Sequence, residues 1–138
     1  MRDGDRVTDS VMTASSGDGR TLALDAPDEA PYLPGDLVVL KPPGAAAQLG
    51  QLTASGEGLL VGTLAEDGTP QRITSRSPYA AAPVEPVTAA HLEALQRAGG
   101  ADLPIGTWSV GEVEVAARLR SQGFGRHTFL CGQSGSGK

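Results

Sequence analysis

Short apolar runs separated by turn residues fill the first half of the chain. They lie at residues 7–12, 20–26, 36–41, 47–54, 58–65 and 70–74. Apolar and polar positions alternate in several of these runs, and Gly, Pro or Asp bounds most of them, which is typical of short strands. We predict a small antiparallel barrel of five or six strands, because closure removes exposed sheet edges.

Two of these runs are nearly continuous in apolar residues: DLVVLK at 36–41 and GLLVGTLA at 58–65. We expect them to supply much of the barrel core, through Leu37, Val38, Val39, Leu40, Leu59, Leu60 and Val61. The Asp-Gly pair at 18–19, between the first two runs, predicts a hairpin turn.

The pattern changes after residue 76. SPYAAAPVEP (77–86) is rich in Pro and Ala and is interpreted as an extended connector. TAAHLEALQRAGG (88–100) predicts a helix with Thr88 as its N-cap, and the alternation in 112–119 favours a strand over an amphipathic helix. We therefore divide the chain into a β-barrel domain (1–76), a Pro/Ala-rich connector with a helix (77–103), and a linker with the start of a further domain (104–138).

Composition and charge narrow the function classes. The 138-residue chain is 39% hydrophobic but only 4% aromatic, and its formal net charge is −5. A segment that holds DNA by itself is more often basic, so we do not expect DNA contacts from this acidic region. The one cysteine, Cys131, excludes an internal disulfide, and the polar N-terminus MRDGDRVTDS lacks the apolar run of a signal peptide. We expect a cytoplasmic protein without a membrane segment.

The last seven residues carry the strongest chemical signal. They read GQSGSGK and fit the G-x-x-x-x-G-K part of a phosphate-binding P-loop, with the members Gly132, Gln133, Ser134, Gly135, Ser136, Gly137 and Lys138. Glycines let backbone N–H groups approach a phosphate closely, and the lysine ammonium reaches the β- and γ-phosphate oxygens. The apolar run at 128–131 is typical of the buried strand before such a loop. We predict that these residues bind ATP and that Lys138 is the catalytic residue.

Other parts of an ATPase site are expected beyond Lys138. They are the Ser or Thr that holds Mg²⁺, the Walker B carboxylate and most of the α/β sheet. We therefore interpret the chain as the front part of a longer ATP- and Mg²⁺-dependent protein, and expect residues 1–138 alone not to hydrolyse ATP. No metal site is predicted within the chain, because one cysteine and two distant histidines make no zinc pattern.

RHTFLCGQSGSGK (126–138) resembles the Walker A segment of the HerA/FtsK superfamily of hexameric P-loop ATPases. PIGTW (104–108) and VEVAARL (113–119) resemble the linker into that motor, and the strand-rich front half resembles its N-terminal HAS-barrel. The expected fold class is therefore mainly β: a small antiparallel barrel with a short helical insert, followed, as the resemblance implies, by the first strand and P-loop of a RecA-like α/β ATPase domain. The insert and helix at 77–100 have no match in the family pattern. The resemblance also implies ATP hydrolysis, a hexameric ring, DNA translocation and often a nuclease partner.

The remaining candidate side chains have simpler interpretations. Trp108 is expected to anchor the packing between barrel and motor, and His91 is expected to face solvent on the helix. A local basic cluster is interpreted as a solvated surface in preference to an arginine finger for a neighbouring subunit, and consists of Arg118, Arg120 and Arg126.

Two rival functions stay open at the level of sequence. One is another P-loop NTPase, of the AAA or ABC type, with an unrelated β-domain in front. The other is a non-enzymatic interaction module whose Gly/Ser-rich tail fits the motif by chance.

Overall fold

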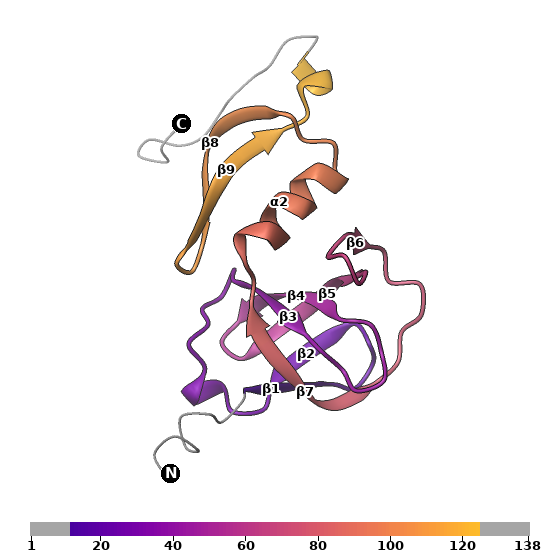
Figure 1. Cartoon of the computed structure of the whole chain (residues 1–138). Coiled ribbons are helices and arrows are strands. Elements are labelled where there is room, and N and C mark those ends of the chain that lie inside the picture. The colour runs from indigo at the N-terminus through magenta and orange to yellow at the C-terminus, as the bar shows by residue number, and fades with distance from the viewer. Residues whose placement is uncertain (1–11, 125–138) are drawn as a thin grey trace, which may run out of the picture.

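The computed structural model describes residues 12–124, which form a mainly β structure with one α-helix (Figure 1). Seven strands lie in the lower part: β1 (Thr13–Ser16), β2 (Thr21–Leu24), β3 (Leu37–Leu40), β4 (Gln48–Ala54), β5 (Glu57–Leu64), β6 (Pro70–Gln71) and β7 (Tyr79–Pro86). Above them lie helix α2 (Ala89–Ala98) and a hairpin of β8 (Leu103–Val110) and β9 (Val113–Leu119). Two short 3₁₀ helices span Pro27–Glu29 and Ser121–Phe124.

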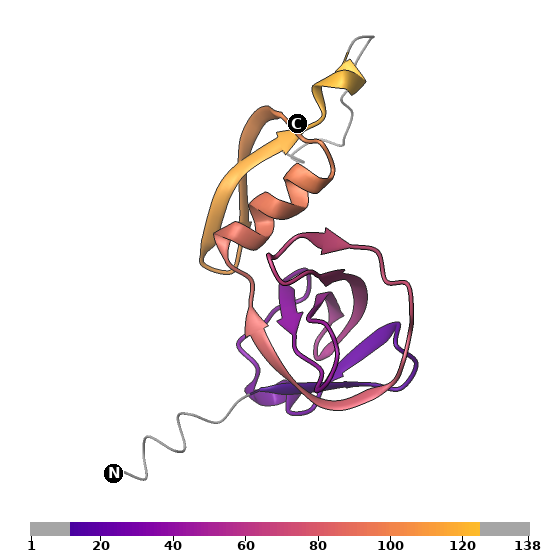
Figure 2. The ribbon, with the colours of Figure 1, turned by 45° about the vertical axis from the view of Figure 1, so that its right-hand side comes forward.

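Six of the strands close into an antiparallel barrel (Figure 2). Their order is β2-β1-β7-β3-β4-β5, and β2 pairs back to β5, with Thr21 opposite Leu59 and Ala23 opposite Glu57. Strand β6 adds a short pairing to the end of β5. The predicted small antiparallel barrel is therefore confirmed, and so is the hairpin between the first two apolar runs, where β1 pairs with β2.

Side chains that alternate along the strands fill the barrel interior. Buried and exposed residues alternate along β5, as expected for a strand with one face on the core. The interior cluster consists of Ala14, Leu22, Leu24, Val38, Leu40, Leu52, Leu60 and Val84. Gly50 is buried in β4, where a Cβ would lie only 2.6 Å from Leu22 Cδ2. This close approach explains a glycine within a strand.

A second apolar cluster lies outside the barrel, between its wall and the helix–hairpin unit (α2, β8 and β9). Strand β3 is buried on both faces, because Val38 and Leu40 belong to the interior cluster while Leu37 and Val39 belong to this second one. The second cluster consists of Leu37, Val39, Leu49, Leu64, Val87, Leu92, Val110 and Val115. Shared burial of these side chains holds the helix–hairpin unit on the barrel.

Helix α2 begins and ends as its sequence predicts. Thr88 is the N-cap, and its Oγ1 accepts a hydrogen bond from His91 N at 3.4 Å. Thr88 N donates in turn to His91 Nδ1 at 3.0 Å, which completes a reciprocal capping box. His91, expected on the solvent side of the helix, is intermediate in exposure, and its ring has the additional role of capping the helix.

Gln96 joins α2 to the edge of β9. Its Nε2 donates to Ala116 O at 2.9 Å, and its Oε1 accepts from Arg118 N at 2.6 Å. The side-chain amide thereby makes the two hydrogen bonds that a neighbouring strand would make. These two bonds occupy part of the hairpin edge and connect it to the helix.

The connector interpretation of 77–86 is wrong for residues 79–86. These residues form β7, which pairs with β1 on one side and β3 on the other, so the barrel continues to Pro86. Pro83 and Pro86 fit the strand without breaking the barrel, and Ala82 and Val84 alternate into its core. The strand predicted within 112–119 is confirmed as β9.

Two residues expected in the core lie on the surface. Leu59 and Val61 are 49% and 50% exposed, because they point to the outer face of β5 where the second cluster does not reach them. The first apolar run begins outside the described residues, and β1 starts only at Thr13.

Within residues 12–124, no helix combines the length and the apolar character needed to cross a bilayer.

Candidate functional site

The predicted phosphate-binding residues, 132–138, lie outside the described residues, as does Arg126. Other candidates from the sequence are placed. Trp108 is half-buried against the second cluster, so it anchors the hairpin to the barrel wall. Arg118 lies in β9, and Arg120 follows it and donates from Nη2 to Gln122 Oε1 at 3.2 Å.

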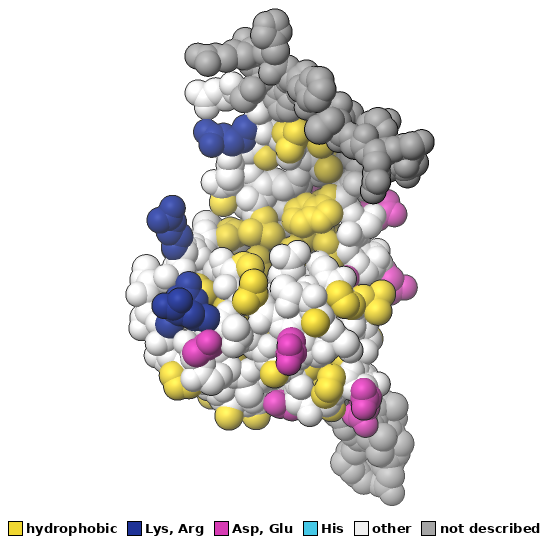
Figure 3. Space-filling view, turned by 180° about the vertical axis from the view of Figure 1, so that it is seen from behind, with side chains coloured by type: hydrophobic (Ala, Val, Ile, Leu, Met, Phe, Trp, Pro, Cys, Tyr) yellow, Lys and Arg dark blue, Asp and Glu magenta, His cyan; other side chains and the backbone are white. Residues whose placement is uncertain are grey.

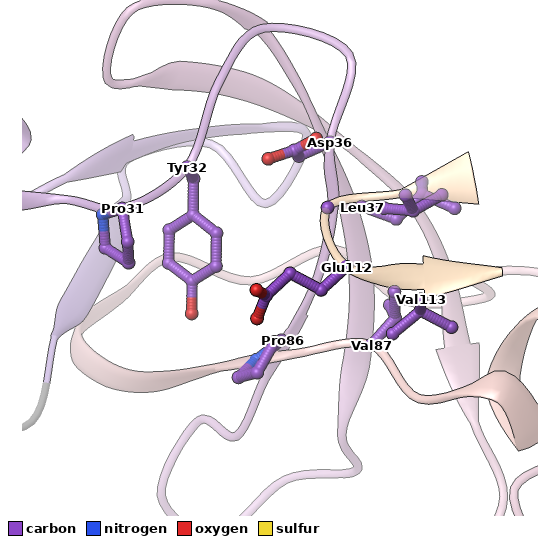
Figure 4. Close-up of a pocket in the computed structure, with 10 residues that line it drawn as sticks. Pro31, Tyr32, Asp36, Leu37, Pro86, Val87, Glu112 and Val113 are labelled. Atoms are coloured by element: carbon purple, nitrogen blue, oxygen red, sulfur yellow. The ribbon is translucent and has the colours of Figure 1, made fainter.

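The described residues form an open cavity where the tip of the hairpin meets the barrel (Figure 4). We call it the Tyr32 groove. Its volume is about 430 Å³, and its walls come from three segments far apart in sequence: the loop 31–37, residues 86–87 at the end of β7, and the β8–β9 turn at 110–113. A groove of this size is large enough for one or two side chains of a partner, or for a small ligand.

The floor of the Tyr32 groove is part of the second cluster. Leu37, Val87 and Val110 line it, and each is at most 8% exposed. These side chains pack between the barrel and the hairpin, so the floor is apolar and held from both sides. A preformed apolar floor lowers the ordering cost of binding.

The loop that carries Tyr32 is fixed by a tight turn. Gly35 has a φ of 96°, a left-handed conformation that glycine adopts without strain, and its N–H donates to Leu52 O at 2.7 Å. Asp36 Oδ2 accepts a hydrogen bond from Leu33 N at 2.9 Å, and Asp36 N donates to Leu33 O at 3.0 Å. The carboxylate of Asp36 is thereby held at the mouth of the groove.

The rim combines an aromatic ring with carboxylates. In Figure 4, Tyr32, Asp36 and Glu112 extend toward the same opening, the first two from the loop and the third from the hairpin tip. Partial burial raises the pKa of the Tyr32 phenol above its usual 10.0, and the negative charges of Glu85 and Asp36 raise it further. The two carboxylates make the surroundings of the ring negative.

A second cavity of about 420 Å³ adjoins the groove on the other side of Pro31 and Tyr32. Its lining includes Asp25 and Glu29. Asp25 accepts hydrogen bonds from Thr13 Oγ1 at 2.7 Å and Ser15 Oγ at 3.0 Å, which fix its position beside the barrel. Among the described residues that line the two cavities, none is Lys or Arg.

This arrangement suits binding. An apolar floor, an aromatic ring and several carboxylates can hold a cationic side chain, whereas no described pair of groups around the groove forms a nucleophile with its base. Within residues 12–124, no three His, Cys, Asp or Glu side chains gather where they could hold a metal ion.

Sequence reasoning missed the Tyr32 groove. PYLPGD at 31–36 is recognisable only as a chain break, and its Tyr and Asp carry no spacing signal that points to a site.

No family model matches the chain, and searches of curated proteins and of solved structures find no match either. The fold and the site therefore define the class by themselves: a closed six-strand barrel that carries a helix–hairpin unit and a binding groove at their junction.

Proposed function

We propose that this chain is the front region of a P-loop ATPase, in which residues 132–138 bind the triphosphate and the barrel serves assembly or partner docking. The observation that carries the proposal is the sequence GQSGSGK, directly preceded by an apolar run at 128–131. Further support comes from lysine usage: Lys138 is one of only two lysines, and it stands at the position where this pattern needs one.

Each part of the motif has a chemical task in this proposal. Gly135 and Gly137 allow the backbone N–H groups to surround the phosphates, and Lys138 places its ammonium group on the β- and γ-phosphate oxygens. The hydroxyl that binds Mg²⁺ follows the lysine in this pattern, so residues 1–138 do not contain it. In this proposal, hydrolysis needs that hydroxyl and a Walker B carboxylate in addition to residues 132–138.

The resemblance to the HerA/FtsK superfamily refines the proposal to a hexameric motor that moves DNA beside a nuclease partner. The closed antiparallel barrel is of the same structural class as an HAS-type barrel, and it precedes the motif in the chain as the resemblance requires. With a net charge of −5, residues 1–138 are assigned no DNA contact, so DNA contacts would come from the motor. An AAA-type or ABC-type motor remains the rival assignment of the same loop.

The test compares Lys138→Ala with Lys41→Ala in the polypeptide that continues beyond Lys138. Lys41 is the matched control, because it is the other lysine and forms only an exposed ion pair with Glu85 at 3.1 Å. We expect Lys138→Ala to lower ATP hydrolysis by about a hundredfold or more and to weaken ATP binding. The substitution removes the positive charge that offsets the negative charge developing on the phosphate in the transition state. Lys41→Ala should retain full activity.

The opposite result would end the proposal. If Lys138→Ala melts normally and hydrolyses ATP at the rate of the unaltered protein, residues 132–138 are a Gly/Ser-rich segment that fits the motif by chance. Residues 1–138 alone should show no turnover, and turnover by this chain would also contradict the assignment.

A further inference from the structure

We infer that the Tyr32 groove binds an arginine side chain presented by an extended, apolar segment of a partner protein. The inference deepens the docking role proposed for the barrel and rests on that role alone. It does not depend on nucleotide binding, because the groove is built entirely from described residues of the barrel and hairpin.

Charge selects a cationic occupant. Four carboxylates line the groove and its adjoining cavity: Asp25, Glu29, Asp36 and Glu112. No described lining residue supplies a compensating positive charge, and Lys41, which follows the end of β3 opposite to Leu37, is paired with Glu85. On the face seen in Figure 3, Lys and Arg side chains lie along the left side, whereas Asp and Glu lie lower and to the right. A cation entering the groove meets attraction from several carboxylates at once.

Geometry favours arginine over lysine. The Tyr32 ring forms one wall, and a guanidinium can stack on such a ring by cation–π contact. Carboxylates stand on both sides of the opening, Asp36 on the loop and Glu112 on the hairpin tip, and a planar fork of donors can pair with them. A compact ammonium would satisfy one carboxylate and lose the stacking contact.

The floor determines what accompanies the arginine. Leu37, Val87 and Val110 are buried, apolar and continuous with the second cluster, so they offer contact to the aliphatic stem of the arginine and to an apolar neighbour. Pro31 and Pro86 widen this apolar surface without adding N–H donors. Nucleic acid is a poor occupant, because its phosphates would meet the carboxylates.

The probe is an equimolar pool of capped pentapeptides with arginine at the centre and leucine, valine, proline or alanine at the other positions. A second pool has citrulline, which keeps the shape of arginine without its charge, and a third has lysine. Each is titrated into uniformly ¹⁵N-labelled chain without nucleotide, and amide shifts are followed by NMR. We expect saturable shifts at Tyr32, Asp36, Val87 and Glu112, with affinity about tenfold higher for the arginine pool than for the citrulline pool.

Three variants locate the binding. Asp36→Asn retains an oxygen that can accept from Leu33 N, Glu112→Gln changes only an exposed hairpin tip, and Tyr32→Leu removes the aromatic face. Each should weaken binding by about fivefold or more, because each removes a charge or the stacking surface. Glu66→Gln is the control: it removes an exposed carboxylate from the β5–β6 turn, away from the groove lining, and should leave affinity unchanged.

Several outcomes would overturn the inference. Equal binding of the arginine and citrulline pools would show that charge does not select the occupant. Absence of saturable shifts at the groove in a well-folded chain would exclude the site. Concentration-dependent shifts at the groove without any peptide would assign it to a second copy of this chain. None of these results bears on Lys138, so a failure here is distinguishable from a failure of the phosphate-binding proposal.

Discussion

Strands β3 and β5 lie on either side of β4 in the barrel, and both are rich in Leu and Val, yet they meet different surroundings. On β3 the outward residues Leu37 and Val39 are 8% and 2% exposed; on β5 the outward residues Leu59 and Val61 are 49% and 50% exposed. The inner faces of both strands fill the same barrel core. The difference is the helix–hairpin unit, which covers one part of the wall and leaves the other open.

The comparison shows what the second cluster contributes. A closed barrel needs only its interior to be apolar, so burial on the outside of β3 reflects an additional attachment. That attachment brings the hairpin tip to the loop 31–37 and thereby creates the Tyr32 groove. Around Leu59 and Val61 of β5 no such unit packs, and the outer wall there has no comparable buried apolar floor.

The largest expected effect comes from placing a charge on the outer face of each strand. Val39→Asp buries a carboxylate in the second cluster and should lower the free energy of unfolding by about 3–5 kcal/mol, the range for an uncompensated buried charge. Val61→Asp, at a half-exposed position, should change it by about 0.5 kcal/mol or less. Urea unfolding of both variants gives the comparison, and equal destabilisation would show that the two faces are equally covered.

A second prediction removes the main contact from the covering side. Leu92 on α2 is fully buried in the second cluster. Leu92→Ala should cost about 2–5 kcal/mol through lost burial and the cavity left behind. Leu59→Ala is the matched control on the uncovered face and should stay within about 1 kcal/mol of the unaltered chain. Thermal melts that ranked the two variants in the opposite order would contradict the packing described.

A smaller effect is expected at the clamp between α2 and β9. Gln96→Ala removes two hydrogen bonds to the backbone of β9 and should cost about 1–2 kcal/mol. Hydrogen exchange at Arg118 N should accelerate, because that amide loses its acceptor. Gln71→Ala, an exposed glutamine on β6, serves as the control. Unchanged protection of Arg118 in the Gln96 variant would mean that another group holds the hairpin edge.

The smallest expected effect concerns Tyr79 on β7, which packs against the interior cluster. Burial against the interior cluster raises the pKa of Tyr79 from 10.0 to about 12. A raised tyrosine pKa favours the neutral form in the fold, so its contribution to stability is complete below pH 10 and is lost as the pH rises toward 12. Tyr79→Phe should lose less stability than the unaltered chain between about pH 9.5 and 11.5. Identical pH profiles in urea unfolding would show that the phenol is not shielded from water.

Much of the barrel could be predicted because local patterns and burial agree there. The apolar run in β3, the turn before β2 and the capped helix α2 each carry a signal that the structure follows. Strand β7 could not be recognised, because Pro83 and Pro86 imitate a connector, and only pairing with β1 and β3 makes the segment a strand. The exposure of Leu59 was equally hidden, because sequence does not reveal which wall another element covers.

The Tyr32 groove could not be predicted for a related reason. Its walls come from the loop 31–37, residues 86–87 and the turn 110–113, which are brought together by the packing of the second cluster. No spacing in the sequence connects Tyr32 with Glu112. The phosphate-binding loop differs in kind: its residues are contiguous, so the sequence alone is enough to propose it.

One measurement tests the covered wall most directly: thiol labelling of a cysteine placed on each strand. Val39→Cys and Val61→Cys are each made in a Cys131→Ser background, and the rate of reaction with a maleimide is measured under native conditions. We expect the cysteine at 61 to react about as fast as in the unfolded chain. The cysteine at 39 should react at least about a hundredfold more slowly, because reaction there requires opening of the second cluster. Equal rates at the two positions, in variants that melt like the unaltered chain, would contradict the covered wall on which the Tyr32 groove depends.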